Sequence, residues 1–303
     1  MGFIRGLLMM LFLVLNTLFW GTLLFLLALI RYGVPSESWR QRWGGRMNII
    51  IDGWVAGNQV MHRILAPMQL EIRGTETLSR QDWYLVISNH QTWSDIFVLQ
   101  AVFGRRVPPL KFFMKQQLIW LPIIGVACYV LDFPFMRRYS REFLERHPEY
   151  RGRDLETTRQ KCERFRSTPT AVLIFVEGTR FTEDKHRAQG SPYAHLLRPR
   201  AGGMGFVLGA MGEQLHGLVD TTIIYPDGTP DFWSFLCGRR RRVIVDVRHT
   251  ELPHELMGGD YVQDPDYRER VQTWIADVWQ RKDQLIDAEL QRARDQHSPH
   301  VHH

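Results

Sequence analysis

The first thirty residues constrain the fold of this chain more than any other feature. The segment from Gly6 to Ile30 reads GLLMMLFLVLNTLFWGTLLFLLALI and carries no charged side chain. A helix of about 20 apolar residues crosses the hydrocarbon layer of a bilayer, and this segment is longer than that. A cleaved signal peptide would have a shorter apolar region and a small-residue cleavage site, neither of which is obvious here. We therefore predict an N-terminal membrane anchor.

Arginines flank the apolar segment on both sides. Arg5 precedes it, whereas Arg31, Arg40, Arg42 and Arg46 follow it. Because basic residues are retained on the cytoplasmic side of a membrane, this distribution places the bulk of the chain in the cytoplasm. The domain that follows the apolar segment is therefore expected to face the cytoplasm.

A second stretch, residues 47–68, mixes apolar residues with Asp52, His62 and Arg63. We interpret it as an amphipathic helix that lies in the membrane interface. The alternatives are a helix that packs on the folded domain and a second membrane span. The expected organisation is an anchor with its interfacial helix (1–68), a folded domain (69–260), a C-terminal amphipathic helix (261–296) and a short tail (297–303).

The composition fits a globular domain with anionic partners. Hydrophobic residues make up 45% of the 303 residues, enough for a sizeable core, and the net charge of +6 favours nucleic acid, phospholipid head groups or a phosphorylated substrate. The three cysteines form no paired pattern, which favours a reducing compartment. We predict no nucleic-acid partner, because no aromatic-basic repeat accompanies the basic runs and the anchor argues for a membrane.

Strand and helix patterns alternate along the domain, which predicts an α/β fold with functional residues where strands end and helices begin. Continuous apolar runs are typical of strands covered on both faces. The expected strands are 70–74, 82–88, 171–176, 219–226 and 239–249. The expected helices are 93–103, 154–165, 202–215 and 267–296.

The sequence VISNHQTWSD places polar residues directly after one of these strands. His90 follows the strand, and Asp95 lies one helical turn later, where its carboxylate can take the imidazole N–H. Such a pair is the base and its orienting partner in a catalytic triad. No Gly-x-Ser-x-Gly elbow or His-Glu-x-x-His motif is present, so a substrate hydroxyl would be the nucleophile and His90 its general base. A buried structural histidine stays open as the alternative.

A second cluster, FVEGTR, ends another buried strand. Gly178 allows a tight turn, and Thr179 and Arg180 offer a hydroxyl and a permanently charged fork suited to phosphate. Glu177 should be hydrogen-bonded, to Arg180 or to the neighbouring loop, because an unpaired buried carboxylate is costly. A β-turn closed by a salt bridge is the alternative interpretation.

Further cations flank an apolar run between these clusters. They are Lys111, Lys115, Arg137 and Arg138. For any single member, an aliphatic stem that covers apolar surface while its charge reaches water is sufficient explanation. The run RRRR at 239–242 is interpreted as a basic turn facing anionic lipid.

In order and spacing, these clusters resemble the lysophospholipid acyltransferases, the family of the 1-acylglycerol-3-phosphate acyltransferases. The family signatures read here as NHQTWSD, GVACYVLDFPFMRR, FVEGTR and VDTTIIYP, within residues 83–260. The ordered set is specific, although each part alone is not. The segments KFFMKQQLIWLPIIG and RFTEDKH bring the chain nearest to the branch that includes the animal microsomal enzymes. Among bacterial proteins the chain resembles an inner-membrane acyltransferase, which implies the inner membrane of a bacterium as its location.

The resemblance implies a central mixed β-sheet flanked by helices, as in glycerolphosphate acyltransferases, and a role for each motif residue. His90 would be the general base and Asp95 its partner. The acceptor's phosphate would be bound by Lys115, Arg138 and Arg180, in a pocket shaped by Glu177, Gly178 and Thr179. The acyl donor would be acyl-CoA or acyl carrier protein, the acceptor a lysophospholipid in a membrane, and no cofactor or metal would be needed.

Several residues depart from the family pattern. Val176 replaces the usual Pro, and Gln117 stands where many members carry Glu. Gly202 falls near a position where relatives often carry Lys, so acceptor choice can differ. The acceptor is expected to be 1-acyl-sn-glycerol-3-phosphate, with another lysophospholipid such as lysophosphatidylglycerol, a membrane-bound hydrolase and a non-catalytic lipid-binding protein as alternatives.

Overall fold

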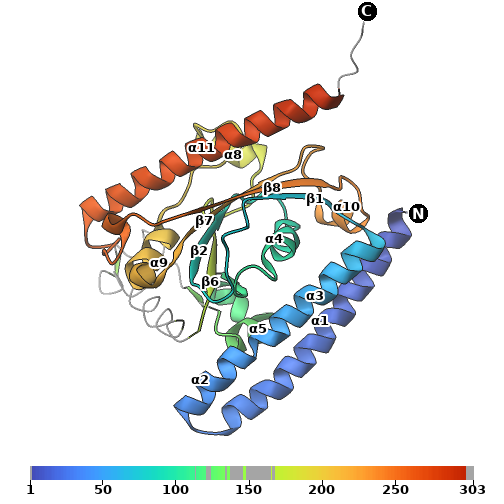
Figure 1. Ribbon diagram of the computed structural model, residues 1–303, viewed down its shortest axis with the longest axis vertical. Helices are drawn as coiled ribbons and strands as arrows, with labels where there is room; N and C mark the ends of the chain where they lie inside the picture. Colours follow the sequence, from blue (N-terminus) through green and yellow to red (C-terminus); the bar gives the residue numbers. More distant parts are fainter. Residues whose placement is uncertain are drawn as a thin grey trace, which may run out of the picture.

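The centre of the molecule is a mixed six-stranded β-sheet, seen in the middle of the computed structural model in Figure 1. The model describes residues 2–112, 114–120, 124–133, 135–136, 146–147, 165 and 168–297. The strands are β1 (Gln69–Arg73), β2 (Tyr84–Ser88), β3 (Leu110–Phe112), β6 (Ala171–Phe175), β7 (Gly217–Ile224) and β8 (Arg242–Thr250), with β4 (Met114–Lys115) and β5 (Phe135–Met136) in a separate pair. The strand order β1-β8-β7-β2-β6-β3 confirms the predicted mixed sheet.

Helices cover both faces of the sheet. The helices of the described residues are α1 (Gly2–Gly33), α2 (Glu37–Arg46), α3 (Asn48–Leu65), α4 (Asp95–Phe103), α5 (Ile124–Val130), α8 (Glu183–Gln189), α9 (Gly202–Met211), α10 (Phe232–Leu236) and α11 (Pro265–His297). Short 3₁₀ turns are η1 (Gln116–Trp120), η3 (Gly212–Gln214) and η4 (His254–Leu256). The helix predicted over 154–165 falls almost entirely outside the described residues.

Strand direction decides where functional residues gather. Four neighbours, β7, β2, β6 and β3, run parallel to one another, whereas β8 pairs antiparallel with β7 and parallel with β1. The carboxyl ends of the three inner strands β7, β2 and β6 therefore meet at one edge. All five residues of β2 are buried, as expected for a strand covered on both faces.

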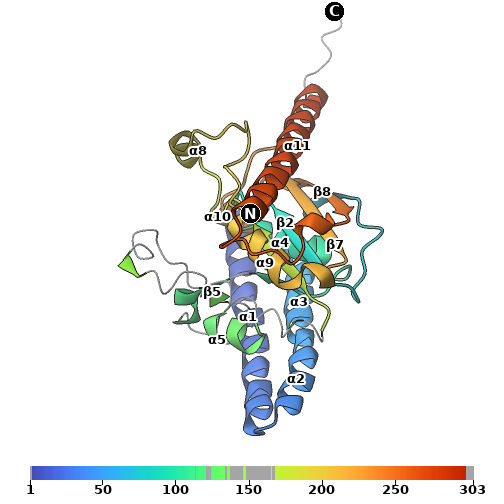
Figure 2. The same ribbon diagram turned by 90° about the vertical axis from the view of Figure 1, so that its left-hand side faces the viewer.

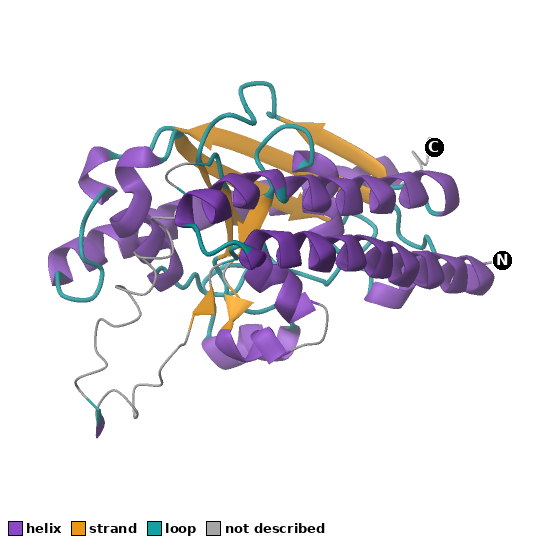
Figure 3. Cartoon of the chain, turned by 90° about the horizontal axis from the view of Figure 1, so that it is seen from below, coloured by secondary structure: helices purple, strands orange, loops and turns teal. Residues whose placement is uncertain are grey.

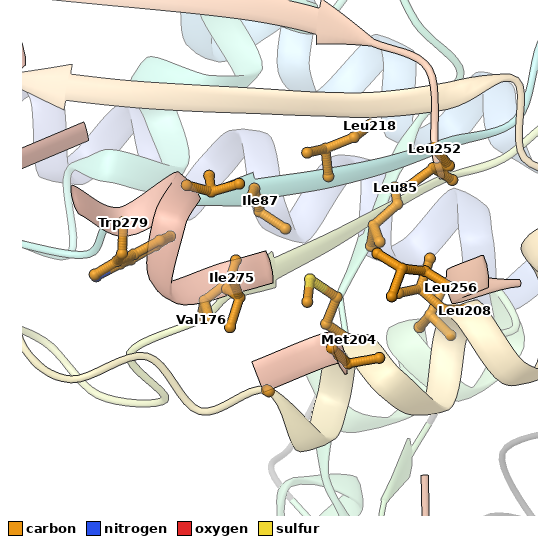
Figure 4. Packing of buried hydrophobic residues seen from close by; sticks show 14 of the residues in the cluster. Leu85, Ile87, Val176, Met204, Leu208, Leu218, Leu252, Leu256, Ile275 and Trp279 are labelled. Atoms are coloured by element: carbon orange, nitrogen blue, oxygen red, sulfur yellow. The ribbon is translucent and has the colours of Figure 1, made fainter. Parts of the chain in front are cut away.

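Two apolar layers sandwich the sheet. Figure 4 shows one of them, in which Leu85 and Ile87 of β2 meet Met204 and Leu208 of α9 and Ile275 of α11. On the opposite face, the alternate residues of β2, whose side chains point the other way, pack against Val98, Leu99 and Val102 of α4. The period-two alternation of β2 thus supplies both layers at once.

The long helix α11 is fixed to the sheet by a buried charge as well as by its apolar stripe. Lys282 is fully buried and forms an ion pair of 2.6 Å with Asp220 of β7. Its Nζ also donates to the Thr221 carbonyl at 2.7 Å and to Thr222 Oγ1 at 2.9 Å. The Asp283 carboxylate, on the next residue, accepts the amides of Ala194 and His195. α11 therefore positions the loop that follows α8.

The apolar segment predicted as an anchor is α1, and α1 forms an antiparallel hairpin with α3 (Figures 1 and 2). Asn16 lies inside this hairpin, where its amide donates to the Trp54 carbonyl and to Asn58 Oδ1, both at 2.9 Å. A Cβ at Gly57 would lie 2.5 Å from the Asn16 side chain, so the two helices can approach only because residue 57 is glycine. The stretch predicted as interfacial packs on α1 and α4 and leaves Ile49, Val60 and Ile64 exposed.

Both ends of α1 contact the same domain. Near its start, Arg5 donates to the Cys237 carbonyl after α10, and at its end Arg31 donates to the Val130 carbonyl and pairs with Asp132 at 2.8 Å. A helix of 32 residues is about 48 Å long, so these contacts lie far apart along it. Among the described residues α1 is the helix long and apolar enough to cross a membrane. In Figure 3, which views the molecule from below, the hairpin lies nearer the viewer than the orange sheet.

Candidate active site

Polar side chains follow three neighbouring strands at the edge where those strands end. Asn89 and His90 follow β2, Glu177 follows β6, and Tyr225 follows β7. Asn89 is completely buried, and its side chain accepts from the Ile223 amide and donates to the Ile223 carbonyl, each at 2.9 Å. This pairing continues the β2–β7 ladder beyond the strand and fixes the turn on which His90 stands.

His90 and Asp95 form the pair that their spacing predicts. The imidazole Nδ1 lies 2.8 Å from Asp95 Oδ2, and the histidine side chain keeps 13% of its surface exposed. With the Nδ1 proton donated to the carboxylate, Nε2 carries the lone pair and can accept a proton. Asp95 is the first residue of α4, where the N–H groups of a helix end favour negative charge.

The Asp95 carboxylate is saturated with donors. Oδ2 also accepts the amides of Gln91 at 2.6 Å and Thr92 at 3.0 Å, and Oδ1 accepts the buried Tyr225 hydroxyl at 2.8 Å. Burial and the adjacent Asp95 charge raise the pKa of Tyr225 well above its ordinary value, so the phenol keeps its proton and donates. Sequence reasoning missed Tyr225. Its signal was the position directly after the strand that ends VDTTIIYP.

The ring of Phe175 stacks on the imidazole. The two centroids are 3.9 Å apart and the planes differ by 16°. Phe175 ends β6, next to β2, so the stacking holds the imidazole plane from one side while Asp95 holds its edge. Together the two contacts restrict the imidazole in both tilt and rotation.

The carboxyl group of Glu177 faces the backbone of the turn that carries His90. Burial raises the pKa of this carboxyl to about 8, against the opposing effect of the backbone amides of His90 and Leu197, which face it. One of its oxygens, Oε2, is buried without a hydrogen-bond partner among the described residues. The sequence predicted that Glu177 is hydrogen-bonded either to Arg180 or to the neighbouring loop. The structure places its partners in the neighbouring loop, and among the described residues Glu177 does not pair with Arg180. Glu177 therefore ties the two motif loops together through backbone.

The loop GTR comes close to the His90 turn. Gly178 adopts a left-handed φ of 69°, which glycine tolerates without strain, and the Phe181 amide donates to the His90 carbonyl at 2.7 Å. Arg180 is exposed, and its guanidinium lies 4.7 Å from the ring centroid of Trp93. The two motifs that the sequence separates by more than eighty residues thus share one surface.

The other predicted cations are placed differently. Lys115 lies in β4, but its side chain is outside the described part of the structure, and Arg138 lies outside the described residues altogether. Lys111 is buried in β3, where burial lowers its pKa to about 8 and its ammonium lies 4.9 Å from the Phe165 ring centroid. Across the described ranges, no cluster of three His, Cys, Asp or Glu residues could hold a metal ion.

Comparison with known proteins gives consistent matches. The model of the family described as Acyltransferase matches residues 69–230, more than half of the chain. The chain is 26% identical over 221 residues to "Probable 1-acyl-sn-glycerol-3-phosphate acyltransferase 5" of Arabidopsis thaliana, covering 68% of this chain and 53% of that protein. It is 27% identical over 187 residues to the human "1-acyl-sn-glycerol-3-phosphate acyltransferase gamma", covering 58% of this chain and 44% of that one.

A solved structure shows the same fold. The crystal structure of "the 1-acyl-sn-glycerophosphate (LPA) acyltransferase, PlsC, from Thermotoga maritima" superposes with a TM-score of 0.51 at 16% identity, covering 92% of this chain and 98% of that one. The chain spans about half the length of the curated relatives it matches. Its motifs, its sheet and the family match over residues 69–230 agree, and the chain belongs to the acyltransferase family.

Proposed function

We propose that the protein transfers a fatty acyl group from acyl-CoA or acyl carrier protein to the free sn-2 hydroxyl of 1-acyl-sn-glycerol-3-phosphate, giving phosphatidic acid. The observation that carries this proposal is the His90–Asp95 pair standing beside the exposed cation of Arg180. Within the described part of the chain, no serine or cysteine side chain is hydrogen-bonded to the imidazole. The nucleophile is therefore assigned to the substrate.

The reaction follows from the position of the lone pair on His90 Nε2. Nε2 removes the proton of the acceptor hydroxyl as its oxygen attacks the thioester carbonyl carbon. Asp95 stabilises the imidazolium that forms, and its own hydrogen bonds hold the carboxylate in place. The tetrahedral intermediate then breaks its C–S bond, and the leaving thiolate takes the proton back from Nε2. The net products are the ester and the free thiol.

The amides of the catalytic turn are already engaged. Those of Gln91 and Thr92 donate to Asp95, and that of His90 faces Glu177. They serve to build the turn, so donors for the developing oxyanion must come from elsewhere, such as the bound substrates or the neighbouring loop. The role of Glu177 in this account is to hold the two loops in register.

An anionic head group suits the charges beside His90. Arg180 would bind the phosphate of the acceptor, aided by Lys115 and Arg138, and so bring the sn-2 hydroxyl to Nε2. Fixing the acceptor in this way converts a bimolecular attack into a nearly unimolecular one. The names of the Arabidopsis and human relatives support 1-acyl-sn-glycerol-3-phosphate as the acceptor, ahead of lysophosphatidylglycerol.

The protein is proposed to sit on the cytoplasmic face of a bacterial inner membrane. The outward face of α1 exposes Leu8, Leu11, Leu15, Leu18 and Phe19, which favours burial in lipid. Because both ends of α1 bind the domain, crossing the bilayer would require one end to detach. We therefore assign α1 an in-plane position, with its exposed face in one leaflet.

The direct test uses purified protein in mixed micelles with acyl-chain-labelled donor. Labelled phosphatidic acid should form only when 1-acyl-sn-glycerol-3-phosphate is added, and a panel of other lysophospholipids ranks the head groups. Acyl-CoA and acyl carrier protein are compared as donors. Free labelled fatty acid as the sole product, independent of the acceptor, would make the protein a hydrolase instead.

A further inference from the structure

Arg180 is held in an unusual position for an exposed cation. Its guanidinium lies over the ring of Trp93, and in the described part of the structure it has no hydrogen-bond or ion-pair partner. Trp93 lies between His90 and Asp95 in the catalytic turn and keeps 55% of its surface exposed. An arginine that contacts an aromatic ring through the face of its guanidinium keeps its N–H edges free for an anion, and the 4.7 Å distance to the Trp93 ring centroid is compatible with such a contact. The stacking thus presents an unpaired fork beside the catalytic base.

A second residue fixes the other side of this arginine. Lys185 of α8 donates from Nζ to Thr179 Oγ1 and to the Arg180 carbonyl, both at 2.9 Å. An ammonium has three N–H donors, so one remains for another acceptor. Lys185 also adds a positive charge next to Arg180, and no carboxylate pairs with either cation among the described residues.

The helix that carries Lys185 contributes little else to the fold. α8 has seven residues, none of them buried. It is held by its Thr182 cap, by a hydrogen bond between His186 Nε2 and the Tyr193 carbonyl at 2.7 Å, by hydrogen bonds from Arg198 to Gln189 at its C-terminal end, and by Lys185. A helix without a buried face gains little from packing. Its contact with the GTR loop is therefore better explained by the site than by the core.

We infer that Trp93 and Lys185 are positioning residues that hold Arg180 ready for the phosphate monoester of the acceptor. This inference rests on the proposed function and adds two residues to its acceptor site. Holding the fork in its bound orientation removes the cost of ordering a long, exposed side chain when the substrate binds. Trp93 sets the plane of the guanidinium, and Lys185 sets the backbone from which the side chain starts.

The phosphate is the group that this arrangement recognises. A bidentate fork next to an ammonium matches a phosphate monoester better than a neutral glycerol head. Loss of either positioning residue should therefore weaken binding of phosphate-bearing acceptors and leave a phosphate-free monoacylglycerol with the same hydroxyl unaffected. The chemical step at His90 should change little, because the hydrogen-bond and ring partners of the imidazole among the described residues are Asp95 and Phe175.

The kinetic test compares Lys185→Met and Trp93→Leu with the wild type in mixed micelles at fixed surface fractions of acceptor. We expect the KM for 1-acyl-sn-glycerol-3-phosphate to rise about tenfold and kcat to stay within about threefold. Lys185→Arg and Trp93→Phe should recover most of the affinity. Arg187→Met removes a cation on the same helix whose one ion-pair partner among the described residues is Asp184, and it should behave as wild type.

Equal losses for the phosphate-bearing and the phosphate-free acceptor, or a fall in kcat with KM unchanged, would overturn the inference. A binding titration tests the inference independently of the proposed function, because the titration requires no turnover. Tryptophan fluorescence of the wild type should change on addition of glycerol 3-phosphate at constant ionic strength, and Trp93→Phe should lose that change. Inorganic phosphate in a parallel titration distinguishes a site for the whole head group from a site for free phosphate. A Lys185→Met titration identical to wild type contradicts the inference even if no acyl transfer is found.

Discussion

The hydroxyl of Tyr225 donates to Asp95 Oδ1, the carboxylate oxygen that does not face His90. The two residues are 130 positions apart, and they meet because β7 lies next to β2 in the sheet. A tyrosine buried to 4% exposure beside a carboxylate adds a strong hydrogen bond to the oxygen that has no backbone donor. Tyr225 is therefore a third member of the hydrogen-bonded group that His90 and Asp95 form.

Replacing this tyrosine should slow the chemistry without unfolding the protein. Tyr225→Phe leaves Asp95 Oδ1 buried without its donor, at a cost of about 1–3 kcal/mol, and frees the carboxylate to rotate away from His90. We expect kcat to fall about tenfold with little change in KM, measured by phosphatidic acid formation. Tyr267→Phe is the matched control, because it removes a buried tyrosine hydroxyl that donates to the Leu256 carbonyl, away from the site. Full kcat in Tyr225→Phe would show that Asp95 needs no such support.

The raised pKa of Glu177 predicts a pH dependence of stability. Burial raises this pKa to about 8, whereas an unfolded glutamate titrates near 4.3. Between these values the native state holds a proton that the unfolded state has lost, so the free energy of unfolding decreases as pH rises through this window. One proton gives a slope of at most about 1.4 kcal/mol per pH unit.

Glu177→Gln isolates this contribution, because glutamine does not titrate and the other groups cancel in the comparison. In urea unfolding at pH 5 to 9, the stability of Glu177→Gln relative to wild type should increase with pH up to about pH 8 and then level off. Parallel curves for the two proteins across the whole range would mean that Glu177 is already ionised at pH 5 in the native state.

The buried ion pair of Lys282 predicts a large loss of stability. Lys282→Met leaves the Asp220 carboxylate without its partner, and breaking such a pair costs about 3–5 kcal/mol. Asp220 keeps 13% of its side chain exposed, which favours a cost at the lower end of this range. The double variant Lys282→Met with Asp220→Leu should regain most of the loss, since no unpaired charge remains. Urea denaturation measures all three proteins, and a cost below about 1 kcal/mol for Lys282→Met would contradict a structural role for the pair.

Local patterns in the sequence predicted the sheet and the contact between His90 and Asp95. The apolar run of β2 is buried from Tyr84 to Ser88, as its continuous hydrophobicity indicates, and His90 meets Asp95 because only the short turn over 91–94 separates them. Both features depend on residues that are close in sequence, so periodicity and spacing were sufficient. The helix α11 was likewise visible as an apolar stripe.

Contacts between distant segments were beyond sequence reasoning. The strand order that brings Tyr225 to Asp95 is a property of the whole sheet, and nothing near Glu177 indicates that its partners are the amides of His90 and Leu197 rather than Arg180. The charge of Lys282 interrupts the apolar stripe of α11 and gave no sign of being buried. The roles assigned to Lys115 and Arg138 stay predictions from the sequence.

The central claim is that the imidazole of His90 removes the proton of the acceptor hydroxyl. The most direct test compares His90→Ala with the wild type in phosphatidic acid formation. A general base contributes about 10²–10⁴-fold to rate, so we predict a loss of about 10³-fold in kcat. Thermal unfolding and binding to phospholipid vesicles should stay near the wild-type values, because the side chain of His90 is partly exposed and does not touch α1. A folded, membrane-bound His90→Ala protein that keeps more than a tenth of wild-type turnover would contradict the mechanism.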